Sequence, residues 1–152
     1  MKKSVMSLAL AVCLAGCAAT GPKHKNYKAL DAACIKGDTA NLVKFFSEGE
    51  AHVYIKEIDG VPTGTEEFYC IAPGKHRLGI SAYNNYQTAQ DYVDLEFEAR
   101  KKYWLRANLR GISFVFQLID ITNEPASKIA EFSLKVGSTS QHMTIPIFIP
   151  AR

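Results

Sequence analysis

The sequence 91-DYVDLEFEARKKYWLRANL-109 carries the clearest structural signal in the chain. Apolar and polar side chains alternate within 91–98 and again within 102–109, which is the period of a β-strand that buries one face. The basic run between them, Arg100-Lys101-Lys102, is typical of an exposed hairpin tip. We therefore expect residues 91–98 and 102–109 to form an antiparallel hairpin.

The apolar residues of this hairpin predict its register. When Phe97 opposes Tyr103, the apolar side chains of both strands fall on one face, whereas a slip of one residue would turn them outward. The same register places Asp94 opposite Arg106 on the polar face. Opposite charges thus meet in a register chosen from the apolar residues alone, so we predict this pair.

Further short strands are expected on both sides of the hairpin. Asp59-Gly60 and Pro73-Gly74 are turn signals in which glycine accepts a positive φ. Residues 112–121 are nearly all apolar, as in a strand covered on both faces, whereas 130–136 alternates but also fits a helix. About seven short strands at even spacing predict a mainly β fold, an antiparallel sandwich or small barrel. The remaining strands are expected near 53–58, 68–71, 78–82 and 143–149.

The segment 27–49 follows a different period. Apolar residues repeat at i, i+3 and i+4 within 30–34 and again within 42–46, and Asp38 is a plausible N-cap between them. We therefore expect two short helices, so the β domain should have a helical N-terminal segment.

A family resemblance agrees with the β fold. The order Ile58-Asp59-Gly60, Ala72-Pro73-Gly74-Lys75-His76, Leu95-Glu96-Phe97-Glu98-Ala99 and Lys102-Tyr103-Trp104-Leu105 resembles small bacterial lipoproteins of unknown function with a PEGA-like domain. The resemblance covers about residues 51–121 and leaves 27–49 and 122–152 outside. It implies an antiparallel immunoglobulin-like or transthyretin-like sandwich without known catalysis. Its motifs are mostly turn residues, so they say nothing about activity.

The N-terminus has the layout of a secretory signal. Lys2 and Lys3 precede an apolar stretch of about ten residues, shorter than the roughly 20 that a transmembrane helix needs. Leu14-Ala15-Gly16-Cys17 resembles the lipobox of bacterial lipoprotein precursors, which implies cleavage after Gly16 and acyl chains on Cys17. The expected parts are a lipoprotein signal peptide at 1–16, a lipidated tether at 17–26 and a single domain at 27–152.

Charge and lipid together predict where the mature chain lies. Loss of Lys2 and Lys3 leaves 16 basic residues against 15 acidic ones, without the concentrated basic face that binding to nucleic acid requires. The membrane is therefore expected as a partner through the lipid anchor. Ala18 stands where lipoproteins kept at the inner membrane commonly carry Asp, so the resemblance favours the outer membrane and a periplasm-facing domain.

Two cysteines remain once Cys13 has left with the signal and Cys17 carries lipid. In an oxidising periplasm, Cys34 and Cys70 would form a disulfide bond. Free thiols or a zinc site are the alternatives, but neither cysteine has a second cysteine or histidine at ligand spacing. We therefore expect the disulfide.

No pattern of catalytic residues stands out. The chain has no nucleophile elbow and no phosphate-binding loop, and its neighbouring carboxylates fit a solvated surface. Its four histidines are scattered, so we expect no metal, no cofactor and no enzymatic activity. The carboxylates are Glu66, Glu67, Glu96 and Glu98, and the histidines are His24, His52, His76 and His142.

Four aromatic residues are candidates for contact with a partner: Tyr83, Tyr86, Tyr92 and Trp104. They occupy polar-side or loop positions, and a turn flanked by tyrosines suits contact with a glycan or a protein. The alternative is that the N-terminal helices cover these rings. The leading hypothesis is a non-catalytic binding or structural module of the cell envelope, with an envelope protein or a glycan as partner. The runner-up is an inhibitor or accessory subunit of an envelope enzyme or secretion machine.

Overall fold

The computed structural model describes residues 21–39, 50–84, 87–137 and 139–143. These residues form ten β-strands and no helix, which confirms the predicted mainly β class. The strands are β1 (Ala33–Gly37), β2 (Glu50–Ile58), β3 (Val61–Pro62), β4 (Tyr69–Ile71), β5 (Gly74–Asn84), β6 (Gln87–Phe97), β7 (Lys102–Arg110), β8 (Ser113–Asp120), β9 (Ser127–Lys135) and β10 (Thr139–Met143).

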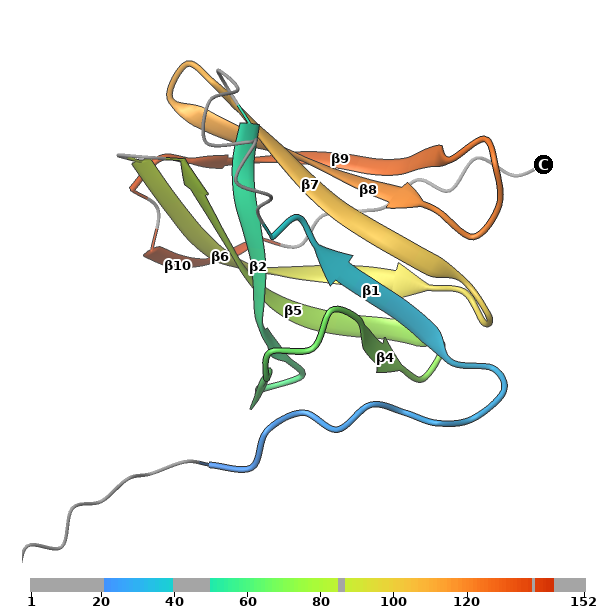
Figure 1. Ribbon diagram of the computed structural model, residues 1–152. Helices are drawn as coiled ribbons and strands as arrows, with labels where there is room; N and C mark the ends of the chain where they lie inside the picture. The colour runs from blue at the N-terminus through green and yellow to red at the C-terminus, as the bar shows by residue number, and fades with distance from the viewer. Residues whose placement is uncertain (1–20, 40–49, 85–86, 138, 144–152) are drawn as a thin grey trace, which may run out of the picture.

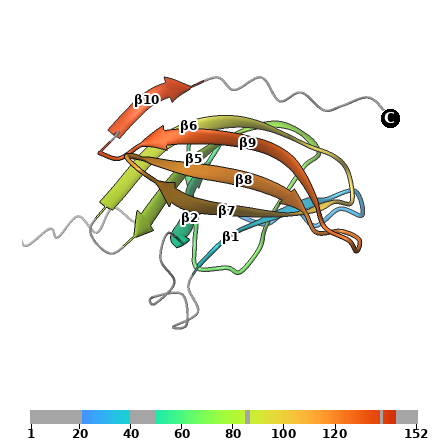
Figure 2. The same cartoon turned by 90° about the horizontal axis from the view of Figure 1, so that it is seen from above.

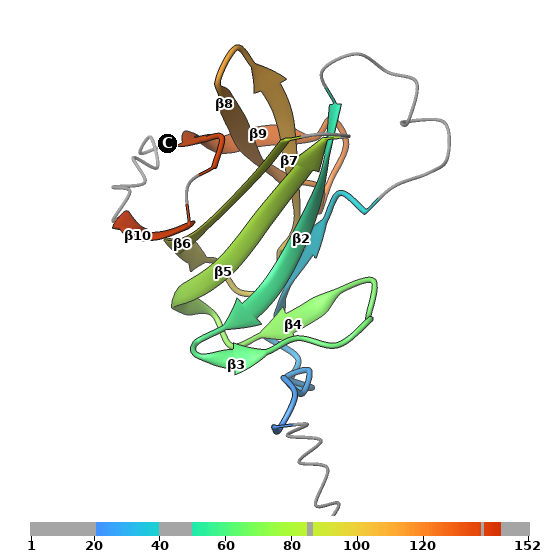
Figure 3. The ribbon, with the colours of Figure 1, turned by 90° about the vertical axis from the view of Figure 1, so that its left-hand side faces the viewer.

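The strands lie in two layers that face each other (Figures 1 and 2). The β7 layer has the order β4-β1-β7-β8-β9, and the β5 layer has the order β3-β2-β5-β6-β10. Strand β2 joins the layers, because Glu50 and Ala51 pair with β7 whereas residues 52–58 pair with β5 (Figure 3). The ten strands therefore form one continuous sheet that folds over on itself.

Two strands run parallel to their neighbours. In the β7 layer, β1 lies parallel to β7 with Cys34 beside Lys102, and in the β5 layer β10 lies parallel to β6. The predicted wholly antiparallel arrangement is therefore wrong, and the sheet is mixed. Both strands are far from their partners in sequence, and alternation reports which face of a strand is buried but not its direction.

The two strands predicted as a hairpin belong to different layers. Strand β6 pairs with β5 along its whole length, and β7 pairs with β8. Residues 98–101 carry the chain from one layer to the other. The predicted hairpin is therefore wrong, and Asp94 lies opposite Arg77 instead of Arg106.

Both of these strands nevertheless bury the predicted faces. Phe97 and Tyr103 meet across the layers, with ring centroids 5.1 Å apart and planes at 79°. The Tyr103 hydroxyl also accepts a hydrogen bond from the Glu98 backbone N–H over 2.9 Å. Strands that face each other across a core show the same alternation as neighbours in a hairpin, so the pattern alone could not separate the two arrangements.

The helix predicted near residues 30–34 is also wrong. Residues 33–37 form β1, between β7 and β4, while Leu30 is 93% exposed. Ala33 and Ile35 are fully buried two positions apart, so a strand period was present beside the helical spacing and pairing with β7 selects it. The second predicted helix, at 42–46, lies outside the described residues.

Strand β1 ends where its backbone approaches β2 closely. A Cβ atom at Gly37 would overlap the Val53 carbonyl oxygen. The Val53 N–H donates a hydrogen bond to the Asp38 carbonyl over 3.0 Å. Glycine alone leaves room for this contact, which holds β1 against the strand that joins the layers.

The later part of the described chain is also β-strand. Strand β9 buries Phe132 and Leu134 alternately, so 130–136 follows the strand period and not the helical one. Strand β8 buries alternate residues from Phe114 to Leu118 but leaves its other face half-buried, so the expected cover on both faces is wrong. Apolar residues are common on exposed faces, so the apolar composition of 112–121 did not show that both faces of the strand are buried. The predicted strand at 143–149 lies outside the described residues except for Met143, where β10 ends.

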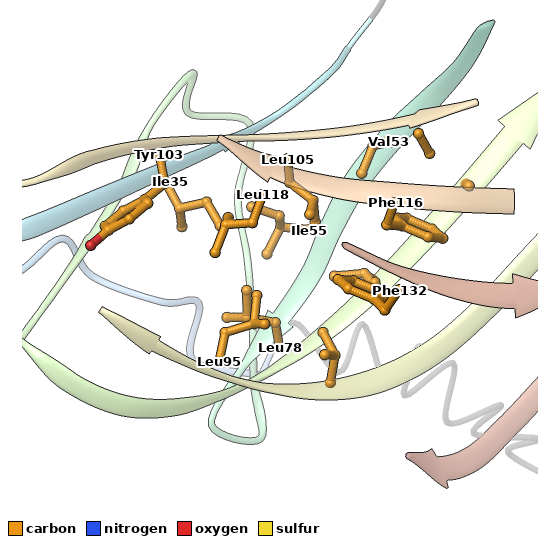
Figure 4. Close-up of a cluster of buried hydrophobic side chains, with 14 of the residues drawn as sticks. Ile35, Val53, Ile55, Leu78, Leu95, Tyr103, Leu105, Phe116, Leu118 and Phe132 are labelled. Carbon is orange, nitrogen blue, oxygen red and sulfur yellow. The ribbon is translucent and has the colours of Figure 1, made fainter. Parts of the chain in front are cut away.

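The core fills the space between the layers (Figure 4). Leu105 from the β7 layer faces Leu78 and Leu95 from the β5 layer, and all three are fully buried. Burial of one such side chain stabilises a fold by about 1.5–3 kcal/mol. Phe116 and Phe132 stack with centroids 5.1 Å apart at one end of this core.

Candidate functional site

The predicted disulfide is confirmed. Cys34 on β1 and Cys70 on β4 lie directly opposite each other in an antiparallel pair, with bonded sulfur atoms and Cα atoms 4.0 Å apart. The bond fastens the short strand β4 to its neighbour β1, which stands where the sequence predicted a helix at 30–34.

Residues 21–32, here named the strap, precede β1 and lie along the edge of β4 (Figure 1). The His24 N–H donates a hydrogen bond to the Pro62 carbonyl over 2.7 Å, and the Tyr27 N–H donates to the Cys70 carbonyl over 2.8 Å. The segment that we read as a tether is therefore attached to the domain from His24 onward.

The four aromatic candidates do not share one surface. Tyr83 on β5 and Tyr92 on β6 lie on the outer face of the β5 layer, whereas Trp104 on β7 lies on the outer face of the β7 layer. Tyr86 and Cys17 are outside the described residues. The crossing of the chain between layers after β6 is what separates Tyr92 from Trp104.

The Tyr92 side chain reaches across β5 to β2. It lies beside Gly79, its opposed residue, where a Cβ atom would come within 3.1 Å of the Tyr92 ring. The Tyr92 hydroxyl donates a hydrogen bond to a Glu57 carboxylate oxygen over 3.4 Å. Glycine at position 79 therefore makes room for the Tyr92 ring, which extends from β6 over β5 to β2.

A groove of about 690 Å³ opens beside Tyr92 on the outer face of the β5 layer. It extends to the end of β2, where the chain turns into β3. Charged side chains of both signs form its walls, so the groove carries no strong net charge. These side chains are Glu57, Asp59, Lys75, His76, Arg77 and Asp94.

Arg77 and Asp94 form a bidentate ion pair in this groove. Arg77 Nε lies 2.9 Å from Asp94 Oδ1, and Arg77 Nη2 lies 3.3 Å from Asp94 Oδ2. The hydrogen bond that Arg77 donates to Asp94 raises the pKa of Arg77 above its usual value. A two-point contact fixes the orientation of both side chains.

Asp59 closes the groove at the turn between β2 and β3. Its φ of 50° and the Gly60 φ of 81° are those of a two-residue hairpin turn, which confirms the predicted turn. Asp59 Oδ2 lies 2.6 Å from His76 Nδ1, and Oδ1 accepts a hydrogen bond from the Arg77 N–H over 2.9 Å. Burial acts to raise the pKa of Asp59, but the hydrogen bonds from His76 and Arg77 outweigh it and lower the pKa.

A second hollow of about 310 Å³ lies on the same face of the β5 layer. Tyr54 and Tyr83 line it with 39% and 37% of their surface exposed. Lys56 Nζ lies 5.0 Å from the centroid of the Tyr54 ring. Our sequence reasoning missed Tyr54, although the buried Val53 and Ile55 on either side of it turn it outward. Neutral polar side chains complete the lining: Ser81, Thr88 and Gln90.

Trp104 lies between two cationic side chains of its own chain. Lys36 Nζ is 5.7 Å and Arg106 Cζ is 4.6 Å from the centroid of its ring. Arg106 in turn pairs with Asp38 over 3.4 Å and with Glu50 over 3.6 Å. These contacts half-bury Trp104 within the β7 layer, so we place the candidate contact surface on the β5 layer.

Two further features are absent from the described residues. In 21–39, 50–84, 87–137 and 139–143, no three His, Cys, Asp or Glu side chains are grouped as metal ligands. No helix within that part of the chain is long and apolar enough to cross a membrane.

Comparison with known proteins gives no relative for this chain. It matches no protein family, no curated protein sequence and no solved structure.

Proposed function

We propose that this chain is a lipid-anchored lipoprotein of the cell envelope that acts as a non-catalytic binding module. The lipobox-like sequence Leu14-Ala15-Gly16-Cys17, after a short apolar stretch, supports an anchor on Cys17. The Cys34–Cys70 disulfide supports an exported protein, because such bonds persist in oxidising compartments. The proposed location is the periplasmic side of the outer membrane.

The domain is proposed to be a PEGA-like sandwich of the immunoglobulin-like or transthyretin-like kind. Two facing layers around one core support this assignment, as does the turn at Asp59-Gly60. At Pro73-Gly74 the chain bends and Gly74, with a φ of 128°, begins β5 instead of forming the expected type II turn. The parallel strands β1 and β10 are departures from a purely antiparallel sandwich.

The proposed binding face is the outer face of the β5 layer. The observation that carries this proposal is the placement of two hollows on one face, about 690 and 310 Å³ in volume. Both volumes fall within or near the range of small-molecule sites. A ligand that runs along β5 would contact the charged groove at one end and Tyr54 and Tyr83 at the other.

The chemistry of this face favours a glycan as ligand. Arg77 is held by Asp94, and Asp59 by His76, so the groove presents fixed hydrogen-bonding groups instead of a group poised for proton transfer. In the second hollow, two partly exposed tyrosine rings can pack against the apolar faces of sugar rings. The neutral groups beside them can bond to sugar hydroxyls; they belong to Ser81, Thr88 and Gln90.

Calorimetric titration of the acylated protein in detergent with soluble fragments of envelope glycan tests this proposal. We expect Tyr54→Ala and Tyr83→Ala each to weaken binding about tenfold, which corresponds to about 1.4 kcal/mol. The control is Ile112→Ala, since Ile112 is 73% exposed on the turn between β7 and β8 and should leave the affinity unchanged.

Equal affinities for the two tyrosine variants and the Ile112 control would contradict the assigned face. Absence of binding by any glycan fragment, together with stoichiometric co-purification of one envelope protein that Tyr83→Ala abolishes, would favour the inhibitor or accessory-subunit function.

A further inference from the structure

The strap is extended, and alternate side chains are turned toward the domain. Asn26 Oδ1 accepts a hydrogen bond from the Cys70 N–H over 2.8 Å, and Asn26 Nδ2 donates to the Phe68 carbonyl over 3.2 Å. The His24 ring lies edge-on to Tyr69 with centroids 6.3 Å apart. Side-chain and backbone contacts together hold this segment in one orientation.

The remaining strap side chains therefore point away from the domain. Successive side chains of an extended chain lie on opposite sides, which places Lys23, Lys25 and Tyr27 on the outward side. All three are exposed, as is Lys28, and Leu30 is 93% exposed in the turn before β1. Long cationic stems, an aromatic ring and an aliphatic side chain are the residue types that contact the interface of a bilayer.

A second basic segment lies next to the end of the strap. The Arg100 N–H donates a hydrogen bond to the Asp31 carbonyl over 3.2 Å, so the crossing between β6 and β7 adjoins the turn that carries Leu30 (Figure 1). Arg100 and Lys102 are exposed, whereas Lys101 is turned to Asp120 at 2.7 Å. We define the basal surface as the exposed strap residues Lys23, Lys25, Tyr27, Lys28 and Leu30 together with Arg100 and Lys102.

The chain between the strap and the proposed anchor is short. Cys17 and His24 are seven positions apart. A fully extended chain spans at most about 3.3–3.6 Å per residue, so this connection reaches no further than about 25 Å. Acyl chains on Cys17 would therefore keep His24, where the strap joins the domain, within that distance of the lipid headgroups.

We propose that the basal surface lies against an anionic lipid bilayer, with Leu30 and Tyr27 at the interface and the lysines near lipid phosphates. This inference rests on the proposed lipidation of Cys17, which supplies proximity, whereas the basal surface supplies orientation. Basic residues near an anionic leaflet are attracted to it within about a Debye length. The bilayer then holds the domain with its basal surface toward the membrane, so that the domain does not rotate freely on its anchor.

Contact with lipid can be read from tryptophan fluorescence. The acylated protein is placed on vesicles of phosphatidylglycerol and phosphatidylcholine with brominated acyl chains, which quench tryptophan on contact. Wild type contains Trp104 alone and gives the baseline. We expect Leu30→Trp to lose its added emission and Ile112→Trp to keep it, because both residues are exposed aliphatics but Ile112 lies on a turn away from the strap. Equal quenching of the two added tryptophans would overturn the proposal.

The attraction of the lysines to anionic lipid is tested by further substitutions in the Leu30→Trp protein. Lys25→Glu and Lys28→Glu should each reduce quenching on these vesicles, and added salt should reduce it for the parent protein. Lys135→Glu is the matched control, because Lys135 is an exposed lysine on β9 outside the basal surface. If the three substitutions act alike, the lysines do not orient the domain and the proposal fails.

The proposed anchor is tested separately by the mass of the Cys17 peptide. An acylated peptide with unquenched Leu30→Trp would refute the basal surface and leave the lipoprotein assignment standing. An unmodified peptide with quenched Leu30→Trp would refute the anchor and support the basal surface as a lipid contact by itself. An unmodified peptide without quenching would refute both.

Discussion

The two short connections on either side of β6 lead to opposite structures. Before β6, the antiparallel strands β5 and β6 pair along their full length, with Asn84 opposite Gln87. After β6, residues 98–101 take the chain into the other layer, where β7 pairs with β8. In each case, two alternating strands are joined by a few polar residues, so local sequence alone does not distinguish a hairpin from a crossing.

Distant segments account for the difference. At the crossing, the Cys34 N–H donates a hydrogen bond to the Lys101 carbonyl over 2.9 Å, and the Lys102 N–H donates to the Thr122 hydroxyl over 2.8 Å. These partners come from β1 and from the connection between β8 and β9. The neighbour of a strand is thus selected by segments far away in the chain, and the crossing leaves Tyr92 in the layer that we assign to binding.

The largest effect is expected where the crossing buries its aromatic pair. Phe97→Ala removes a fully buried ring that packs on Tyr103 from the opposite layer, and such truncations cost about 3–5 kcal/mol. Urea unfolding measures the loss. Tyr83→Ala, in the hairpin strand β5 but 37% exposed, is the control and should cost about 1 kcal/mol or less. Similar losses for both variants would mean that Phe97 does not join the layers.

A somewhat smaller effect is expected from the disulfide, which acts on the β7 layer alone. Replacing Cys34 and Cys70 together by Ala should cost about 2–4 kcal/mol, because the bond closes a loop of 36 positions in the unfolded chain. Hydrogen exchange should speed up in β4 and the strap while the β5–β6 pair keeps its protection relative to global unfolding. Equally faster hydrogen exchange in both layers would contradict the claim that the disulfide acts on the β7 layer alone.

The ion pair of Arg77 on β5 with Asp94 on β6 should contribute little to stability, but the contribution should be specific to these two residues. A double-mutant cycle of Arg77→Ala and Asp94→Ala is expected to give a small favourable coupling, as for other cross-strand charge pairs. The same cycle for Asp94 with Arg106 should give no coupling, since those residues lie in different layers. Coupling in the second cycle alone would favour the hairpin that the sequence predicts.

The smallest expected effect is in the pH dependence of stability. The pKa of Asp120 at the crossing is lowered, because hydrogen bonds from Lys101 and Thr122 outweigh the effect of burial, and the pKa of Asp59 is lowered in the same way by His76 and Arg77. A carboxylate with a lowered folded pKa stabilises the fold above its unfolded value of about 3.9, and this contribution is lost as the pH falls through the folded pKa.

Asp120→Asn and Asp59→Asn should therefore be less stable than wild type near pH 7, and the differences should shrink in acid. The deficit should be larger for Asp120→Asn, because its side chain is 11% exposed whereas that of Asp59 is 50% exposed and screened by solvent. Thermal unfolding between pH 2 and 7 measures both, with Glu96→Gln, on an exposed strand position, as the control. If the losses of stability do not change with pH, they do not arise from the lowered pKa values of Asp120 and Asp59.

Much of the fold was predictable because it depends on local patterns. Alternation identified the buried residues of β6, β7 and β9, and the residue types of Asp59-Gly60 identified a turn that has two positive φ values. The pairing of Cys34 with Cys70 followed from their number once Cys13 and Cys17 were assigned to the expected signal and anchor.

What escaped prediction depends on contacts between distant segments. Strand β1 was read as a helix, because its partners β7 and β4 are far away in sequence. The helical spacing of Leu30, Ala33 and Cys34 also stands beside the strand period of Ala33 and Ile35. The groove escaped for the same reason: Asp59, His76 and Asp94 come from three strand regions that only the register of β2, β5 and β6 brings together.

The central claim is that β6 has β5 as its neighbour and faces β7 only across the core. Nuclear Overhauser contacts between backbone protons of the folded protein test it directly, because they arise only between residues that are adjacent in a sheet. We predict backbone contacts of Asp94 with Arg77, and of Trp104 with Ile119, and none between Asp94 and Arg106. Backbone contacts between Asp94 and Arg106 would show that residues 91–109 form a hairpin and would contradict both the two-layer assignment and the separation of Tyr92 from Trp104.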